Sequence, residues 1–174
     1  MAILTLVIAP DPKLKQISAP VASVTSEIRQ LMDDMLETMY FEKGAGLAAV
    51  QVGVMLRVIV IDIENDDGKH YLLQMANPVI VAKSADTCTH NEGCLSFPEQ
   101  RVEITRAREV TVNYIDYDNK QATIIADEWL ATALQHEIDH LDGKLLVDYA
   151  SSLKRGLMNE RARKLKLMKM KKPV

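Results

Sequence analysis

Apolar side chains recur at three- and four-residue steps between residues 25 and 43, which predicts an amphipathic helix there. Thr25 or Ser26 can cap the start of this helix, and Gly44 can end it. The apolar positions that define its buried face are Ile28, Leu31, Met32, Met35, Leu36 and Met39. The preceding stretch, MAILTLVIAP, is apolar up to Pro10 and predicts a first strand or an extended arm.

A different pattern predicts strands in the middle of the chain. LRVIVIDI (56–63) is short, β-branched and almost wholly apolar, which is typical of a buried strand. EVTVNYID (109–116) and QATIIAD (121–127) flank the polar residues DNK, so we expect them to pair as a hairpin. Strands that follow one another without helices between them favour an α+β fold with antiparallel sheet.

A second helix is predicted to begin at Asp127, whose carboxylate can cap it, and to run through roughly residue 142 before Gly143. A third is expected from Ser151 or Ser152 to near Lys169. Its expected apolar stripe consists of Leu153, Leu157 and Leu165. Pro173 lies past its expected end.

The composition fits one domain without a membrane span. The chain has 174 residues, of which 48% are hydrophobic and 26% charged, as is ordinary for a globular protein. It contains no run of 18 apolar residues, and MAILTLVIAP lacks the basic residues that begin a signal peptide. We therefore predict a cytoplasmic protein in which Cys88 and Cys94 stay unpaired, because reducing compartments keep thiols free.

Charge is distributed unevenly along the chain. Residues 154–172 carry nine Lys or Arg and one acid, Glu160, a charge of +8, which leaves −11 for the remainder of a chain whose net charge is −3. A basic tail on an acidic body suggests an anionic partner for the tail. The other interpretation is a solvated helical face.

The sequence LQHEIDHLDG (134–143) predicts a metal site. His136 and His140 are four residues apart with Glu137 between them, and on a helix this spacing places both imidazoles on one face. A hydrolytic metal usually takes three protein ligands and leaves one position for water. A third ligand must therefore come from elsewhere, unless the two histidines are simply surface residues beside a glutamate.

Three positions are candidates for the third ligand. An extended zinc-protease motif would place a histidine where this chain has Leu146, which carries no donor atom. A thermolysin-like peptidase would use a glutamate about twenty residues on, and Glu160 lies there. Cys94, within NEGCLSFPE, would bind as a thiolate, and Gly93 beside it allows close approach of the backbone. Cys94 is favoured because Glu160 lies among arginines, and Glu160 remains the alternative.

Three stretches in this order resemble the motifs of peptide deformylase: GAGLAAVQVG (44–53), EGCLS (92–96) and QHEIDH (135–140). The resemblance extends from ILTLVIAPDPKLK near the start to the basic tail. It implies antiparallel β-sheets packed around a central helix that carries HEIDH, with an N-terminal and a C-terminal helix. Residues 1–150 would form a single catalytic domain, and residues 151–174 its basic helical extension.

The resemblance also implies the chemistry. A hydroxide bound to the metal attacks the formyl group on the initiator methionine of a nascent polypeptide, and Glu137, as general acid and base, moves the proton to the leaving nitrogen. Formate is released. The implied metal ligands are Cys94, His136 and His140, and the implied donors to the oxyanion are the Gln51 side chain and the Leu95 backbone N–H.

Further residues are carried over in the same way. Glu92 and Arg106 resemble an ion pair that braces a ligand histidine. The residues expected to border an extended peptide are Ala45, Gly46, Gly93, Leu95 and Arg101. Those expected to line the methionine pocket, on the helix face that carries the ligands, are Trp129, Thr132 and Ala133. We expect His90 to be exposed rather than at the pocket rim, and neither His70 nor Cys88 to take part in the chemistry.

The implied cofactor is one divalent metal per chain. Zinc suits a Cys/His/His set on ligand softness, whereas the family resemblance implies ferrous iron in the cell, with nickel or cobalt as substitutes. The implied partners are an N-formylmethionyl peptide and, through residues 154–172, the ribosome, with no membrane involved. The rival interpretations are a thermolysin-like metallopeptidase and a ribosome- or RNA-binding protein that has kept the scaffold without the activity.

Overall fold

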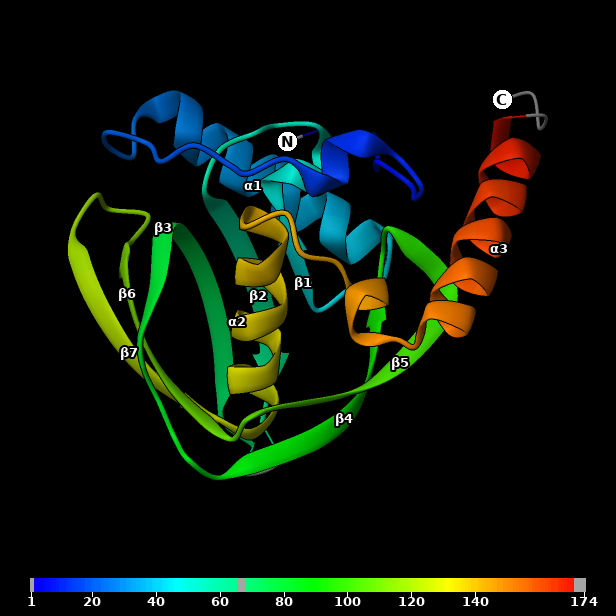
Figure 1. The fold of residues 1–174 in the computed structure, drawn as a ribbon. Helices are drawn as coiled ribbons and strands as arrows, with labels where there is room; N and C mark the ends of the chain where they lie inside the picture. Colours follow the sequence, from blue (N-terminus) through cyan, green and yellow to red (C-terminus); the bar gives the residue numbers. More distant parts are fainter. Residues whose placement is uncertain (1, 66–67, 171–174) are drawn as a thin grey trace.

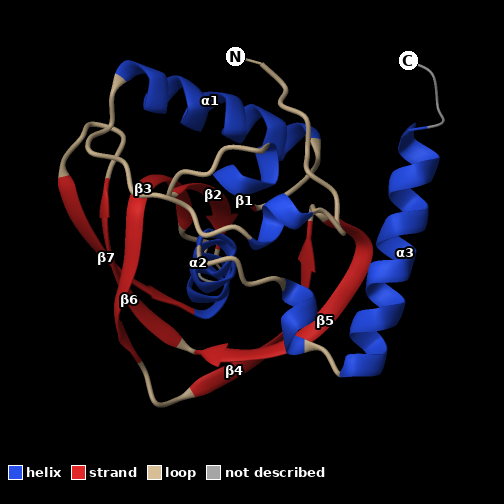
Figure 2. Cartoon of the chain, turned by 45° about the horizontal axis from the view of Figure 1, so that its top comes forward, coloured by secondary structure: helices blue, strands red, loops and turns tan. Residues whose placement is uncertain are grey.

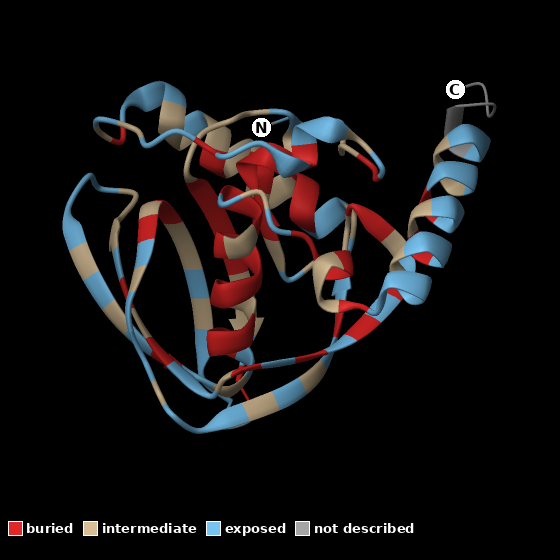
Figure 3. Cartoon of the chain, viewed as in Figure 1, coloured by how far each residue is buried: buried red, intermediate tan, exposed pale blue. Residues whose placement is uncertain are grey.

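Helix α2 (Glu128–Leu141) runs through the middle of the molecule, and the other elements surround it (Figure 1). The computed structural model describes residues 2–65 and 68–170. Ten of the 14 residues of α2 are buried (Figure 3). A helix buried on nearly every side has to be enclosed by several elements. The sequence HEIDH lies in the second half of this helix.

A five-stranded antiparallel sheet lies on one side of α2. Its strand order is β1-β2-β3-β6-β7. The strands are β1 (Gly46–Ala48), β2 (Val58–Glu64), β3 (His70–Lys83), β6 (Glu109–Ile115) and β7 (Gln121–Asp127). Leu130, Leu134 and Leu141 of α2 pack in one cluster with Ile59 and Met75 of the sheet. The β-branched and large apolar side chains of the sheet therefore form the principal core against α2.

The other side of α2 faces a long two-stranded hairpin, β4 (Thr87–Cys94) and β5 (Phe97–Ala107). Figure 2 shows this hairpin curving around α2 and ending in a tight turn. The register shifts at Gly93 and Cys94, so that Cys94 pairs with Phe97 across a turn of two residues. Sequence patterns did not predict these two strands, because their long alternation of polar and apolar residues was interrupted by the motif EGCLS.

Helix α1 (Ser26–Phe41) covers the sheet near β1 and β2. Thr25 caps it as predicted, its Oγ1 accepting from the amide of Ile28 at 3.4 Å. The prediction that Gly44 ends the helix was wrong, because the left-handed residue after the last turn is Lys43, with a φ of 58°. Gly44 instead touches Leu95, whose Cδ1 would lie 2.7 Å from a Cβ added at this position.

The strand predicted at 56–63 corresponds to β2, and the hairpin predicted at 109–116 and 121–127 to β6 and β7. The described residues 2–10 form an arm rather than a strand. Asp127 occupies the position before α2 but does not cap it with its side chain. Its carboxylate instead accepts from Asn65 Nδ2 at 3.3 Å.

Helix α3 (Ser152–Met170) lies along β5 at the edge of the molecule (Figures 1 and 2). The predicted stripe was wrong at Leu153 and Leu157, which are 77% and 60% exposed. Met158 and Ala162 are buried instead, and they pack with Phe97 and Val102 side chains of β5 in one cluster. A helix at the edge of the molecule buries only a narrow strip of its surface. The small side chain of Ala162 lies in that strip, and Leu153 and Leu157 lie outside it. Pro173 lies outside the described residues.

We predict that Met158→Ala lowers the free energy of unfolding by about 2 kcal/mol or more, because it leaves a cavity beneath α3. Leu157→Ala, one residue away on the exposed side, should change it by less than about 0.5 kcal/mol. Urea unfolding followed by circular dichroism measures both. Equal losses in the two variants would mean that α3 packs through a different face.

Candidate active site

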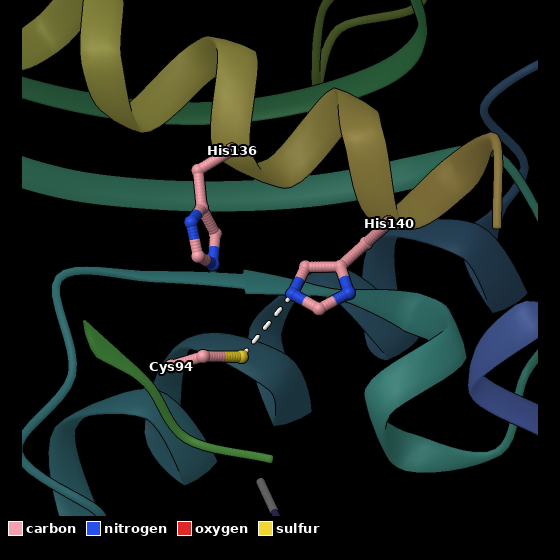
Figure 4. Close-up of side chains that lie close together, drawn as sticks. All are labelled: Cys94, His136 and His140. Atoms are coloured by element: carbon pink, nitrogen blue, oxygen red, sulfur yellow. Dashed lines mark hydrogen bonds between the residues drawn. The ribbon is translucent and has the colours of Figure 1, made fainter. Parts of the chain in front are cut away.

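Three donor atoms converge between α2 and the end of β4. His136 and His140 point to the same side of α2, and Cys94 reaches them from the last residue of β4 (Figure 4). The Cys94 Sγ lies 3.3 Å from His140 Nε2, and one donor atom from each residue lies within 4.8 Å of the others. Among the described residues, this is the one group of three or more such side chains that could hold a metal ion.

The residues of this cluster fit a divalent transition metal. One thiolate and two imidazoles are a recognised three-ligand set that leaves one position open. Glu160 does not join them: its side chain is 57% exposed on α3 and pairs with Lys164 at 3.0 Å. The structure therefore brings Cys94 to the histidines and leaves the alternative ligand on the surface.

His136 is held by a buried ion pair. Its Nδ1 lies 2.9 Å from Glu92 Oε2, and Arg106 donates to both Glu92 oxygens, at 2.6 and 2.9 Å. Burial by itself would raise the pKa of Glu92, but the hydrogen bonds from His136 and Arg106 outweigh it and hold the pKa below its ordinary value. An ionised Glu92 keeps the proton of His136 on Nδ1, so that Nε2 presents its lone pair to the site.

Glu137 is buried on α2, between His136 and His140 in sequence, and faces Gly46 of strand β1. Its Oε2 has no hydrogen-bond partner among the described residues. A Cβ added to Gly46 would lie 2.5 Å from Glu137 Oε1, so only glycine allows this approach. Burial raises the pKa of Glu137 to about 7, which suits a group that takes up and releases a proton near neutral pH.

Gln51 lies in a short 3-10 helix, Ala49–Val52, and is 1% exposed. Its Oε1 accepts from the backbone N–H of Ala48 at 2.8 Å, and this hydrogen bond sets the orientation of the side-chain amide. Its Nε2 then points to the site and donates to Ser96 Oγ at 3.2 Å and to Cys94 Sγ at 3.5 Å. A buried amide donor beside the thiol is a suitable group to bind a developing negative charge.

A cleft of about 600 Å³ opens beside Cys94, His136 and Glu137. The structure places on its walls every residue expected to border the peptide or the methionine side chain: Ala45, Gly46, Gly93, Leu95, Arg101, Trp129, Thr132 and Ala133. Sequence reasoning missed Ile63, Phe97 and Glu99, which also line it. Phe97 and Glu99 belong to β5, one of the strands that were not predicted, and no local pattern marks them as cleft residues.

His90 is half-buried, which corrects the expectation that it is exposed. Alternation along β4 puts it on the same face as Glu92, toward α2. Its ring meets Trp129 edge-on, with the centroids 4.1 Å apart. Cys88 and Cys94 are both free, and the Cys88 Sγ lies 4.0 Å from Thr132 Oγ1. Neither His90 nor His70 lines the described cleft.

A buried helix with two histidines that could bind a metal, a glutamate between them and a cysteine from a neighbouring hairpin is the arrangement typical of a metal-dependent hydrolase. The model of the polypeptide deformylase family matches residues 3–156. The chain is 50% identical over 171 residues to peptide deformylase 1 of Rickettsia conorii, covering 95% of this chain and 98% of that one. It belongs to the peptide deformylase family, hydrolases that remove the N-formyl group from nascent peptides.

Solved structures agree. The crystal structure of peptide deformylase from Ehrlichia chaffeensis superposes with a TM-score of 0.92 at 38% identity, covering 97% of this chain and 99% of that one. A class I type b peptide deformylase from Acinetobacter baumannii, solved with Met-Ala-Ser bound, gives a TM-score of 0.80 at 33% identity, covering 85% and 98%. The predicted family, enzyme class and α+β fold are confirmed.

We predict that, without metal, Glu137→Gln stabilises the protein more at pH 8 than at pH 4.5. Because burial raises the pKa of Glu137 from 4.5 to about 7, the folded protein binds this proton more tightly than the unfolded chain. Wild-type stability therefore falls as pH rises from 4.5 to 7, by about 3 kcal/mol from this group, and glutamine removes the loss.

Denaturant unfolding of the chelator-treated proteins across this pH range measures the difference. Glu160→Gln, on the exposed face of α3, is the matched control and should gain no stability as pH rises. A difference between Glu137→Gln and wild type that stays constant with pH would show that Glu137 is ionised throughout.

Proposed function

We propose that this chain hydrolyses the formamide bond of N-formylmethionyl peptides and releases formate, with Glu137 as general acid and base. The observation that carries the proposal is the cluster of Cys94, His136 and His140 beside a buried Glu137 whose Oε2 has no hydrogen-bond partner among the described residues. The family is metal-dependent. The thermolysin-like alternative would need Glu160 as the third metal ligand, but Glu160 is exposed on α3 and pairs with Lys164.

Cys94, His136 and His140 would hold one divalent metal, which supplies a nucleophilic hydroxide from water near neutral pH. We propose ferrous iron as the metal in the cell, with zinc, nickel or cobalt able to occupy the same ligands in purified protein. The thiolate of Cys94 favours all four over magnesium or calcium.

The other groups would act directly on the substrate. Glu137 takes the proton of the attacking water and delivers it to the leaving nitrogen, which a carboxyl with a pKa of about 7 can do in both directions. Gln51 Nε2 donates to the oxyanion that forms from the formyl oxygen. The backbone N–H of Leu95, in the turn after Cys94, would be the second donor.

The peptide would bind as an added strand. β1 is the last strand of its sheet, and its outer edge pairs with no strand among the described residues, so it is free to pair with an extended chain. The Acinetobacter baumannii relative binds Met-Ala-Ser. In this chain Ala45, Gly46 and Gly93 would border the peptide, and Arg101, whose Nη1 donates to the Asn91 carbonyl at 2.9 Å, would lie along it.

The methionine side chain would enter the cleft along α2. Trp129, Thr132 and Ala133 form one wall there, on the face of the helix that also carries His136. An unbranched thioether fills such an apolar slot well. We propose residues 1–150 as the single catalytic domain, with residues 151–174 as a helical extension, acting in the cytoplasm. None of the described helices is both long and apolar enough to cross a membrane.

We predict that anaerobically purified protein, loaded with ferrous iron or nickel, releases formate from formyl-Met-Ala-Ser. Cys94→Ala should lower kcat/KM by at least about a thousandfold, because a lost ligand removes the metal's charge stabilisation of several kcal/mol, and bound metal should fall with it. Glu160→Ala should keep both. The reverse pattern would favour the peptidase, and metal-loaded wild-type protein that releases no formate would refute the proposal.

We further propose that α3 docks on the ribosome through its basic face. Lys166 pairs with Asp11 at 3.1 Å and Arg161 with Glu99 at 3.2 Å, both across to other segments, whereas Lys164 pairs only with Glu160 on the surface of α3 itself. The exposed cations Lys154, Arg163 and Lys164 extend its basic surface outward. Such a surface suits a phosphate backbone, whose binding weakens as salt rises.

Replacing Lys154, Arg163 and Lys164 by glutamine should reduce co-sedimentation with ribosomes at low salt by roughly tenfold, by removing contacts to phosphate. Formate release from the tripeptide should be unchanged, since none of the three lines the cleft. Unreduced co-sedimentation, also after deletion of residues 154–174, would refute docking through α3. Ribosome binding by a wild-type protein without formate release would instead support the non-catalytic alternative.

A further inference from the structure

The ion pair that holds His136 continues away from the cleft to two more residues. Arg106 Nη1 donates to Asp139 Oδ2 at 2.9 Å, and the Tyr149 hydroxyl donates to the same oxygen at 2.6 Å. Arg106 Nη1 also lies 3.2 Å from the Tyr149 oxygen, and its guanidinium carbon is 4.9 Å from the centre of the Tyr149 ring. Asp139 and Tyr149 thus hold the end of Arg106 that Glu92 does not.

These contacts form a closed path through the fold. It leaves α2 at His136, crosses to Glu92 on β4 and Arg106 on β5, and returns to α2 at Asp139, three residues after His136. Tyr149 joins it from a short 3-10 helix, Leu146–Tyr149. Because both ends of the path lie on one turn of a buried helix, a movement of Arg106 would be transmitted to His136.

Two carboxylates lie beside Arg106 on this path, and the Lys144 ammonium lies 4.0 Å from the centre of the Tyr149 ring at its outer end. Glu92 and Asp139 are two carboxylates sharing the single guanidinium of Arg106, whose side chain is 5% exposed. The pKa of Arg106 is raised by these partners, so it stays charged. With part of Arg106 committed to Asp139, Glu92 retains more negative charge toward the Nδ1–H of His136. A stronger acceptor at Nδ1 makes Nε2 a better electron donor.

The two ligand histidines differ in this respect. His140 Nδ1 is buried and has no hydrogen-bond partner among the described residues. Among the described residues, the hydrogen bond that makes Nε2 a better electron donor is therefore made by His136 and not by His140. On the far side of the path, a polar cavity of about 220 Å³ is bordered by Arg106, Asp139 and Tyr149.

We propose that Asp139 and Tyr149 are positioning residues for the metal: through Arg106 and Glu92, they fix the orientation of His136 and strengthen its bond to the ion. This inference rests on the proposed function, in which His136 is a ligand. It assigns no contact with substrate to either residue. Its effect should appear in metal retention and in the electronic environment of the ion, both measurable without turnover.

The test uses cobalt-loaded full-length protein, with metal transfer to an excess chelator followed over time. Asp139→Asn should accelerate metal loss by roughly tenfold or more and shift the visible cobalt absorption, and Tyr149→Phe should do so in the same direction to a smaller degree. Asp142→Asn is the matched control. Asp142 directly follows α2 and, like Asp139, pairs with an arginine, Arg57 at 2.7 Å, but it lies outside this path.

Thermal unfolding of the metal-free proteins separates positioning from stability. If Asp139→Asn and Tyr149→Phe lower Tm but leave the cobalt absorption and the rate of metal loss at the values of Asp142→Asn, the proposal is wrong and the residues only brace the fold. Should Asp139→Asn fail to fold, Tyr149→Phe decides, since it removes one hydroxyl. Cobalt bound by wild type and equally by Cys94→Ala would refute the ligand assignment instead, independently of Asp139.

Discussion

The central constraint in this molecule is that α2 is buried and yet carries ionisable side chains. An imidazole or carboxylate taken out of water needs a partner or must change its protonation. For His136 the partner is Glu92, and for Glu92 it is Arg106. Glu137 has no such partner for its Oε2 among the described residues, and its pKa rises instead. The fold thus holds His136 in a fixed hydrogen-bonded position and leaves Glu137 free to exchange a proton.

The two sheets supply what α2 cannot. The hairpin β4–β5 brings Cys94, Glu92 and Arg106 from outside the helix, and β1 brings the backbone of Gly46 against Glu137. Each contact joins residues far apart in sequence. The donor cluster therefore exists only when the hairpin and the five-stranded sheet have both closed on α2, which makes the site a product of the whole core.

How far the sequence could predict this depended on the range of each interaction. Local signals within one element predicted α1 from its periodicity, α2 from residues at its two ends and the β6–β7 hairpin from the runs around DNK, and the four-residue spacing placed His136 beside His140. The stripe of α3 failed because burial there depends on the partner surface, which accepts Ala162 and leaves Leu157 in solvent. Similarly, nothing local to Tyr149 indicated its contact with Asp139, because that contact forms between separate segments.

The N-terminal arm has a consequence for the order in which the site can form on a growing chain. The Val7 amide donates to the Gln51 carbonyl at 2.7 Å, and the Ala9 amide to the Ser96 carbonyl at 2.9 Å. These early residues thus bond both to the segment of Gln51, whose side chain contacts Cys94, and to the turn that follows Cys94. They are made first, and Ala9 remains without its acceptor until the ribosome has added Ser96. The N-terminal third contains both partners of the Val7–Gln51 contact, but this side of the site is complete only after the chain has been extended past its midpoint to Ser96.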